Sequence, residues 1–240
     1  MLVEKVVADD VCRIILNRPQ SHNTLTKDMI EELSHTLVKA DKDVRVLILE
    51  GAGKSFCSGA DMNGLFDMSF RQLKSFAIMG KKVCAQLEAM KVPTIAVLKG
   101  HTLGEGIELA LCCDFRIASD KTTFEFPQIR HGYTPGFGAT SKLPKLLGRA
   151  RALELLISGL AFDAKTACAL GLVTQCVSDK QLQKKVDHLV SLIMKRHPLA
   201  VAAVKQLVHS GDFVKETSYF AEQLSMPDTK LNIKELLGGK

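Results

Sequence analysis

Two glycine-containing segments, each directly after an apolar run, constrain this chain more than any other feature of its sequence. The first reads SFCSGAD over residues 55–61 and comes after the run VRVLIL at 44–49. The second reads GHTLGEGIEL over residues 100–109 and comes after PTIAVL at 93–98. Glycine allows a backbone N–H group to approach a ligand closely, and the start of a helix expected at 105–113 adds partial positive charge. Two N–H donors directed at one carbonyl oxygen would stabilise an enolate or a tetrahedral oxyanion, so the pair predicts an oxyanion hole.

Length and composition indicate one globular domain. The chain has 240 residues, of which 46% are hydrophobic and 24% charged, which is ordinary usage for a globular protein. This length suits a single α/β domain over residues 1–240 with a well-buried interior. The sequence has no apolar run of about 18 residues, and its start lacks the basic and apolar regions of a signal peptide. We therefore expect a cytoplasmic protein with no membrane partner.

Cysteine usage and charge narrow the expected partners. The seven cysteines lie mostly inside apolar runs without the paired spacing of metal ligands, so we expect small buried hydrophobes in a reducing compartment and no metal. The net charge is +6, but aromatic residues make up only 5% of the chain, which argues against a nucleic-acid surface. Two interpretations stay open: a solvated basic face, or attraction of an anionic carrier, either coenzyme A or an acidic acyl carrier protein.

Hydrophobic periodicity predicts alternating strands and helices. Strands are expected at 2–7, 11–16, 44–49, 94–98, 114–118 and 123–125. Helices are expected at 26–42, 72–90, 105–113, 138–146, 148–158, 164–170, 179–196 and 198–210, followed by a polar, lysine-containing tail. The pattern fits repeated strand–helix units better than a simple doubly wound sheet.

The motifs resemble one known family over nearly the whole chain. The matching stretches are NRP at 17–19, HNTL at 22–25, FCSGAD at 56–61, GEGIELALCCDFRIA at 104–118, FPQ at 126–128, AKTA at 164–167 and GLV at 171–173. These motifs closely resemble those of the crotonase superfamily of enoyl-CoA hydratases and isomerases. The resemblance implies a β-β-α superhelix over residues 1–195 and a C-terminal helical region over 196–240 that builds homotrimers or hexamers. It also implies an acyl thioester on coenzyme A or phosphopantetheine, with no permanently bound cofactor.

The resemblance assigns the oxyanion hole to two residues. The backbone N–H groups of Ala60 and Glu105 match those that hold the thioester oxygen in the family, where the second position is usually glycine. A peptide N–H does not need a glycine side chain, so Glu105 can still donate. Its carboxylate is expected to point away, because it would oppose an enolate. The resemblance also places residues of the carrier-binding groove at His22, Asn23, Thr24, Ser58, Gly59, Asp61 and Gly104.

The acid–base residues depart from the family pattern. Hydratases of this family use two carboxylates, one to orient the nucleophilic water and one to supply or remove a proton. Glu108 matches the first, but the second falls at Gln128. An amide does not exchange a proton near neutral pH, so the sequence predicts little hydration of crotonyl-CoA and argues against the usual double-bond isomerisation.

Decarboxylation needs no initial proton abstraction, because loss of carbon dioxide itself generates the enolate. The segment RHGYTPGFGAT at 130–140 resembles the decarboxylases of polyketide β-branching cassettes, which act on a 3-methylglutaconyl group carried by acyl carrier protein. Those enzymes place a lysine where this chain has Lys74, and the final proton could come from Glu108, Tyr133 or His131. The sequence therefore predicts a decarboxylase of this kind.

Two alternatives remain beside that reading. One is an enoyl-CoA hydratase, dehydratase or isomerase acting on a coenzyme A or acyl-carrier-protein thioester. The other is a non-catalytic crotonase-like binding protein, in which Glu105 and Gln128 mark lost activity.

Overall fold

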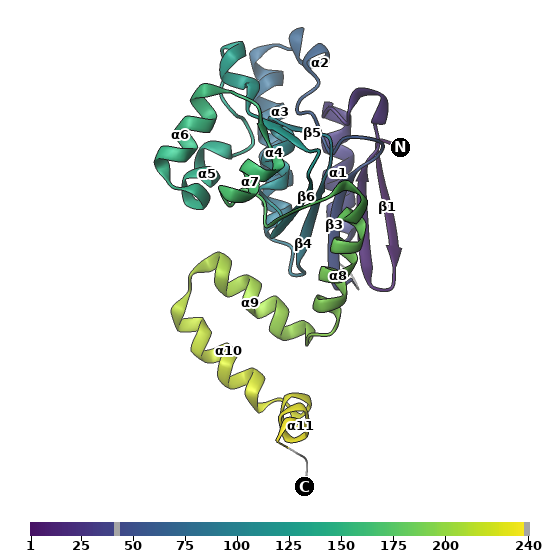
Figure 1. Cartoon of the computed structure of the whole chain (residues 1–240), viewed down its shortest axis with the longest axis vertical. Coiled ribbons are helices and arrows are strands. Elements are labelled where there is room, and N and C mark those ends of the chain that lie inside the picture. The colour runs from purple at the N-terminus through teal and green to yellow at the C-terminus, as the bar shows by residue number, and fades with distance from the viewer. Residues whose placement is uncertain (41–43, 238–240) are drawn as a thin grey trace.

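A six-stranded sheet forms the centre of the molecule, and a three-stranded sheet lies beside it (Figure 1). The computed structural model describes residues 1–40 and 44–237. The large sheet has the order β1 (Val3–Ala8), β2 (Val11–Leu16), β3 (Val46–Gly51), β4 (Thr94–Leu98), β6 (Phe115–Ser119) and β9 (Gln175–Val177). The small sheet has the order β5 (His101–Leu103), β7 (Thr123–Glu125) and β8 (Phe162–Asp163).

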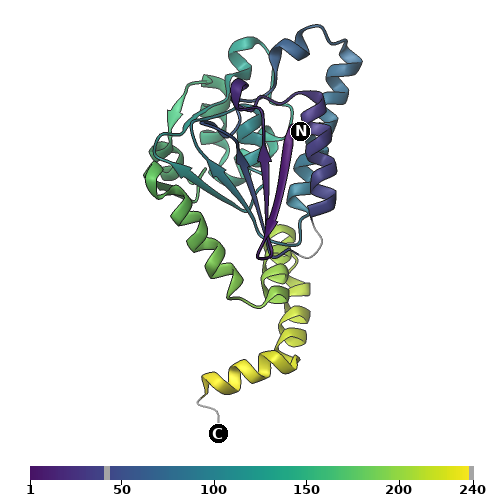
Figure 2. The same cartoon turned by 90° about the vertical axis from the view of Figure 1, so that its right-hand side faces the viewer.

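Helices cover both faces of the large sheet, because most of its strands are parallel and parallel strands need crossover connections. Only β1 and β2 form an antiparallel pair in this sheet, whereas β2, β3, β4, β6 and β9 run parallel. Figure 2 shows α1 (Lys27–Ala40) and α3 (Phe70–Glu88) on one face and α8 (Leu182–Met194) on the other. The large sheet has a hydrophobic core on each face, and alternate residues of β3 point into the two cores. Leu47 and Leu49 pack on the side of α1 and α3, and Val46 and Ile48 pack on the side of α8.

The chain passes repeatedly from the large sheet to the small one and then into a helix. Strand β4 ends at Leu98, β5 begins at His101 in the small sheet, and α4 (Glu105–Ala110) follows. The next passage runs from β6 through β7 into the 3₁₀ helix η2 (Pro127–His131). This succession is the β-β-α superhelix expected from the resemblance. It brings the ends of successive passages to one edge of the molecule.

Most expected elements are present within a few residues of their expected bounds. The expected helix at 26–42 is α1, and its last two expected residues lie outside the described part of the chain. The expected helix at 105–113 ends at Ala110, and the one at 179–196 begins as the 3₁₀ turn η3 (Asp179–Gln181) before α8. Strands β5, β8 and β9 were not expected, whereas β7, which is as short as β5 and β9, was. All seven cysteines are free, and five are buried.

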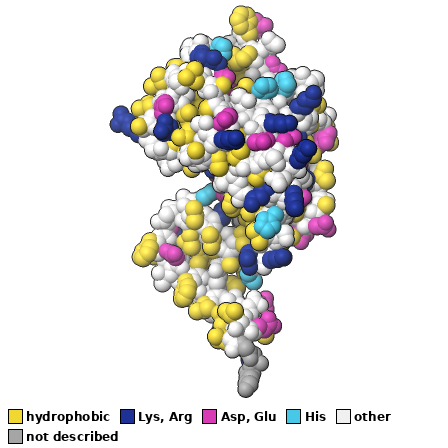
Figure 3. Space-filling model, viewed as in Figure 1, with side chains coloured by type: hydrophobic (Ala, Val, Ile, Leu, Met, Phe, Trp, Pro, Cys, Tyr) yellow, Lys and Arg dark blue, Asp and Glu magenta, His cyan; other side chains and the backbone are white. Residues whose placement is uncertain are grey.

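The C-terminal helical region that the resemblance implies over 196–240 is present. The segment after residue 210, where hydrophobic periodicity predicts only a polar tail, is helical as far as Leu236. Helices α9 (Pro198–Ser210), α10 (Phe213–Ser225) and α11 (Pro227–Leu236) leave the body one after another (Figures 1 and 2). Their apolar side chains gather on the lower part of Figure 3, and those at Val208, Phe213, Val214 and Phe220 are at least 67% exposed. Among the described residues, no helix combines the length and apolar character needed to cross a membrane.

We predict that the chain self-associates through the exposed apolar side of α9–α11, because monomers rarely leave so large an apolar surface in water. The mass in solution, measured by light scattering, should exceed the 26.3 kDa of one chain. Replacing both Phe213 and Phe220 with Asp should shift the protein towards the monomer. Ser218→Asp, an exposed position turned to the other side of α10, is the matched control. A monomeric wild type at micromolar concentration would contradict the prediction.

Candidate active site

The two glycine-containing segments lie side by side, as the sequence predicts. The Cys57 N–H donates to the His101 carbonyl oxygen at 3.2 Å, and the Leu103 N–H donates to the Cys57 carbonyl oxygen at 2.9 Å. The approach is close enough to require glycine at Gly106, because a Cβ there would lie 2.2 Å from the Cys57 oxygen. The start of α4 is thereby fixed against the first segment.

The Glu105 carboxylate occupies the centre of this junction. The Ala60 N–H donates to Glu105 Oε2 at 2.9 Å, and the Glu105 residue is 5% exposed. The expectation that this carboxylate points away is therefore wrong. A buried N–H requires an acceptor, and the side chain of Glu105 reaches this one. Gly59, with φ of 94°, leaves room for this carboxylate, because a Cβ at position 59 would lie only 3.0 Å from Glu105 Oε2.

Gln128 completes a buried polar group with Glu105. Its Nε2 donates to Glu105 Oε1 at 3.3 Å, and its residue is 1% exposed. Gly104, at φ of 49°, has no side chain to exclude the amide; a Cβ there would lie 3.0 Å from Gln128 Nε2. The Gln128 Oε1 atom is buried and has no hydrogen-bond partner within the described residues.

Glu108 lies on α4, three residues after Glu105, and is fully buried. Its Oε1 accepts hydrogen bonds from the Phe137 N–H at 2.9 Å and the Ala139 N–H at 2.8 Å. Its Oε2 has no partner among residues 1–40 and 44–237. Burial raises the pKa of Glu108 to about 7, the Glu105 charge acts in the same direction, and the backbone donors oppose it. A carboxyl group with this pKa can accept or donate a proton at neutral pH.

The segment that holds Glu108 is itself fixed against α3. The Phe137 ring lies 5.6 Å from the Phe76 ring, between centroids. It also lies directly against Gly80, where a Cβ would be 2.1 Å from a ring carbon. Sequence analysis did not identify Gly80 or Phe76, because their role appears only when α3 and the 137–139 segment meet.

Three further residues were predicted to be catalytic: Tyr133, Lys74 and His131. Tyr133 is half-buried, and its hydroxyl lies 3.6 Å from Met62 Sδ. Burial, with the Glu105 and Glu108 charges, raises its pKa to about 12, so the phenol stays protonated and can donate. Lys74 and His131 are exposed, and the described residues give neither side chain a hydrogen bond or ion pair with the two carboxylates.

The predicted carrier-binding residues support the first segment. The buried Asn23 Nδ2 donates to the carbonyl oxygens of Ala52 and Ser55, both at 2.9 Å, and of Phe56 at 3.2 Å. Asn23 Oδ1 accepts from the Arg18 N–H at 2.8 Å. All the polar atoms of this side chain therefore hold the protein's own loop.

His22, Ser58, Thr24 and Asp61 connect the same two loops. Ser58 Oγ donates to the His22 carbonyl oxygen at 3.1 Å. Arg18 Nη1 donates to the Thr24 carbonyl oxygen at 2.7 Å and pairs with Asp61 Oδ2 at 2.9 Å. Arg18 was missed as a site-positioning residue, although it lies inside the quoted 17–19 motif.

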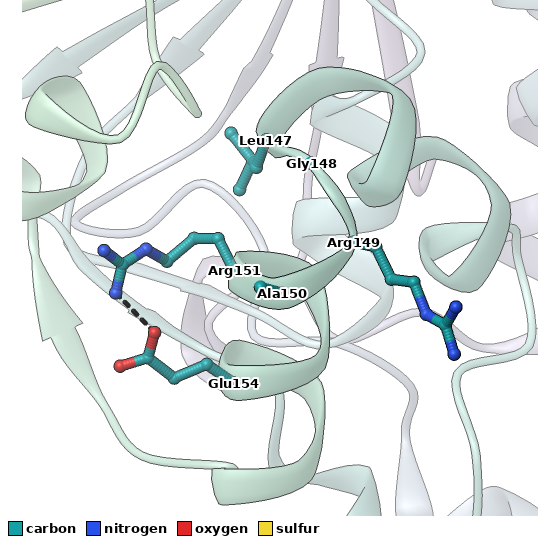
Figure 4. Close-up of a pocket in the computed structure, with 6 residues that line it drawn as sticks. All are labelled: Leu147, Gly148, Arg149, Ala150, Arg151 and Glu154. Atoms are coloured by element: carbon teal, nitrogen blue, oxygen red, sulfur yellow. Dashed lines mark hydrogen bonds and ion pairs between the residues drawn. The ribbon is translucent and has the colours of Figure 1, made fainter.

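A hollow at the junction of α5 (Ala139–Leu147) and α6 (Arg149–Ser158) lies apart from these residues (Figure 4). Arg149 and Arg151 point in different directions there, and Arg151 pairs with Glu154. None of the predicted site residues lines this hollow. We therefore take the Ala60–Glu105–Glu108–Gln128 group as the candidate active site.

Comparison with known proteins identifies the family of this chain. A family model described as enoyl-CoA hydratase/isomerase matches residues 7–232. The chain belongs to the enoyl-CoA hydratase/isomerase family. A crotonyl-CoA hydratase of Syntrophomonas wolfei is 38% identical over 201 residues, covering 82% of this chain and 77% of that protein. A short-chain-enoyl-CoA hydratase of Clostridium acetobutylicum is 34% identical over 230 residues, covering 92% of this chain and 88% of that protein.

Solved structures of the family share the fold. The crystal structure of an enoyl-CoA hydratase from Bacillus anthracis superposes with a TM-score of 0.94 at 30% identity, covering 100% of this chain and 97% of that one. Glu105 and Gln128 stand where the resemblance described above implies a glycine and a carboxylate, and the two side chains contact each other in this structure.

Asn23→Ala should lower the free energy of unfolding by about 3 kcal/mol, because it removes the donors of buried carbonyl groups. Asn63→Ala, at an exposed residue of α2 (Met62–Phe66), is the matched control and should change stability by less than about 0.5 kcal/mol. Urea unfolding of both variants measures the difference. Equal transition midpoints would show that the Asn23 hydrogen bonds do not hold the loop.

The raised pKa of Glu108 predicts a pH-dependent stability. Because the folded-state pKa lies above the ordinary value of 4.5, the stabilising contribution is fully present below pH about 4.5 and is lost as the pH rises through about 7. Between these two pH values, the free energy of unfolding of wild type should fall by on the order of 3 kcal/mol relative to that of Glu108→Gln. Urea unfolding from pH 4 to pH 8 tests this, and a constant difference between the two proteins would contradict it.

Proposed function

We propose that this chain catalyses the reversible addition of water to the double bond of a 2-enoyl-CoA thioester. The observation that carries the proposal is the Glu108 carboxyl group. One of its oxygens is fixed by two backbone N–H groups, the other has no partner within the described residues, and its pKa is raised to about 7. Such a group can bind a water molecule, orient it and accept its proton.

The polarising groups would be the N–H groups of Ala60 and Glu105. The Glu105 N–H is the first of α4 and has no acceptor within the helix. Hydrogen bonds from both donors to the thioester oxygen would draw electrons from the double bond and stabilise the enolate formed when water attacks C3. Glu108 would take the proton of that water. The net charge of +6 favours the approach of the anionic phosphates of coenzyme A.

Hydration is favoured over decarboxylation by two observations. The similar proteins described above carry hydratase or hydratase/isomerase names. Lys74, which the decarboxylase reading needs beside a departing carboxylate, has an exposed side chain on α3. The buried, proton-exchanging Glu108 also favours catalysis over a role confined to binding.

The test is a steady-state assay of crotonyl-CoA at neutral pH, followed by loss of the conjugated thioester absorbance. Wild type should form 3-hydroxybutanoyl-CoA, and Glu108→Gln should lower kcat by at least about 100-fold. Glu31→Gln, at an exposed residue of α1, is the matched control and should retain activity.

Parallel reactions distinguish the other readings. Release of carbon dioxide from a 3-methylglutaconyl thioester without hydration of crotonyl-CoA would replace hydration by decarboxylation. Turnover confined to crotonyl-acyl carrier protein would overturn the choice of coenzyme A. Tight binding of these thioesters without any turnover would identify a binding protein.

A further inference from the structure

The side chain of Glu105 is a buried carboxylate placed where the substrate oxygen has to bind. It is 5% exposed and accepts hydrogen bonds from the Ala60 N–H and from Gln128 Nε2. The ion pairs formed within residues 1–40 and 44–237 include neither Glu105 nor Glu108. A buried carboxylate without a cation is costly, so an ordinary structural salt bridge does not explain this residue.

We propose that Glu105 is a second catalytic carboxylate of the reaction, exchanging a proton with C2 of the thioester while Glu108 acts on the water. The inference rests on the proposed function and assigns the acid–base role that Gln128 cannot fill. Before the thioester binds, the Glu105 carboxylate accepts from Ala60; when it binds, the carboxylate gives up that donor to the thioester oxygen and turns towards C2.

The geometry requires such a displacement. A backbone N–H has one hydrogen, and in this structure the Ala60 hydrogen is directed at Glu105 Oε2 at 2.9 Å. A thioester oxygen can therefore use this donor only after Oε2 leaves. The second hydrogen bond, from Gln128 Nε2 to Oε1, involves the other oxygen and can be kept while the carboxylate turns. Gln128 thus acts as a positioning residue for Glu105.

The two carboxylates are placed to act together. Glu105 and Glu108 are three residues apart on α4, a spacing that puts side chains on the same side of a helix. Their charges interact, because Glu105 contributes to the raised pKa of Glu108. Burial raises the pKa of Tyr133, and both charges act in the same direction.

The step balances with these two groups. In the direction of water loss, the Glu105 carboxylate accepts the proton of C2, and the electron pair of that C–H bond moves into the enolate held by the N–H groups of Ala60 and Glu105. The enolate then forms the C2–C3 double bond as the C3–O bond breaks, and the Glu108 carboxyl group, whose pKa is raised to about 7, gives its proton to the leaving hydroxyl group, which departs as water. Hydration is the reverse of these steps, and proton exchange between Glu105 and Glu108 restores the starting state.

The experiment compares Glu105→Gln, Glu105→Gly and the double variant Glu105→Gly/Gln128→Glu with wild type. The first readout is kcat and KM for crotonyl-CoA. The second is deuterium incorporation at C2 of butanoyl-CoA in D₂O, a reaction that involves only C2 proton transfer and no water addition. Glutamine is close to glutamate in size and its amide oxygen can still accept the Ala60 N–H. Glu105→Gln therefore removes proton transfer by the side chain without removing the hydrogen bond that supports the fold.

Both single variants should lower kcat and C2 exchange by at least about 100-fold. Glu105→Gly should also lower KM, because the substrate oxygen no longer displaces a carboxylate. The double variant should regain at least tenfold in C2 exchange over Glu105→Gly, because it returns a carboxylate to the site without blocking Ala60. Glu31→Gln is again the control.

Three outcomes would overturn the proposal. If Glu105→Gly raises kcat/KM with kcat unchanged or higher, the carboxylate only blocks the hole. If Glu105→Gln keeps full kcat and C2 exchange, the role is structural. If the double variant recovers nothing while remaining folded by circular dichroism, position 128 does not adjoin the proton-transfer site. A wild type that fails to hydrate crotonyl-CoA refutes the proposed function instead, and its C2 exchange still tests Glu105.

Discussion

The close approach of α4 to the first glycine-containing segment is the constraint on which the site depends. Gly106 faces the Cys57 carbonyl oxygen at a distance that leaves no room for a Cβ. Backbone hydrogen bonds between 57 and the strand at 101–103 fix the same junction. Since Ala60 and Glu105 lie a few residues from this contact, their N–H groups hold fixed relative positions without any side-chain contribution.

Around this rigid junction, the polar groups are arranged at a cost to stability. Burial of Glu108 and its repulsion from Glu105 both disfavour ionisation, and the two backbone donors at 137 and 139 only partly offset them. The result is a carboxyl group that titrates near neutral pH. Strongly shifted pKa values of this kind are common at sites that act as an acid or a base.

The support of the site comes from elements distant in sequence. Arg18 and Asn23 hold the first segment from one side, and α3 holds the Glu108 donors from another through Gly80 and Phe137. None of these residues needs to touch substrate.

Much of this could be predicted from the sequence. The apolar runs at 44–49 and 94–98, followed by glycines, predict buried strands that end in ligand-approaching loops, and both are present. The quoted motifs predict the family and the superhelix, but they do not predict that Gln128 contacts Glu105 rather than Glu108. The resemblance predicts a C-terminal helical region, but hydrophobic periodicity does not predict α10 and α11, because their apolar positions are interleaved with charged residues and face no core formed by the described residues.

The direction of the Glu105 side chain could be decided only by the tertiary structure. Sequence fixes its place at the start of a helix, and charge repulsion with an enolate suggests that it turns away. The fold instead buries the Ala60 N–H and the Gln128 amide beside it, and buried donors take the nearest acceptor. Local chemistry determined which groups are present, whereas burial, which depends on every passage of the chain, determined which of them are paired.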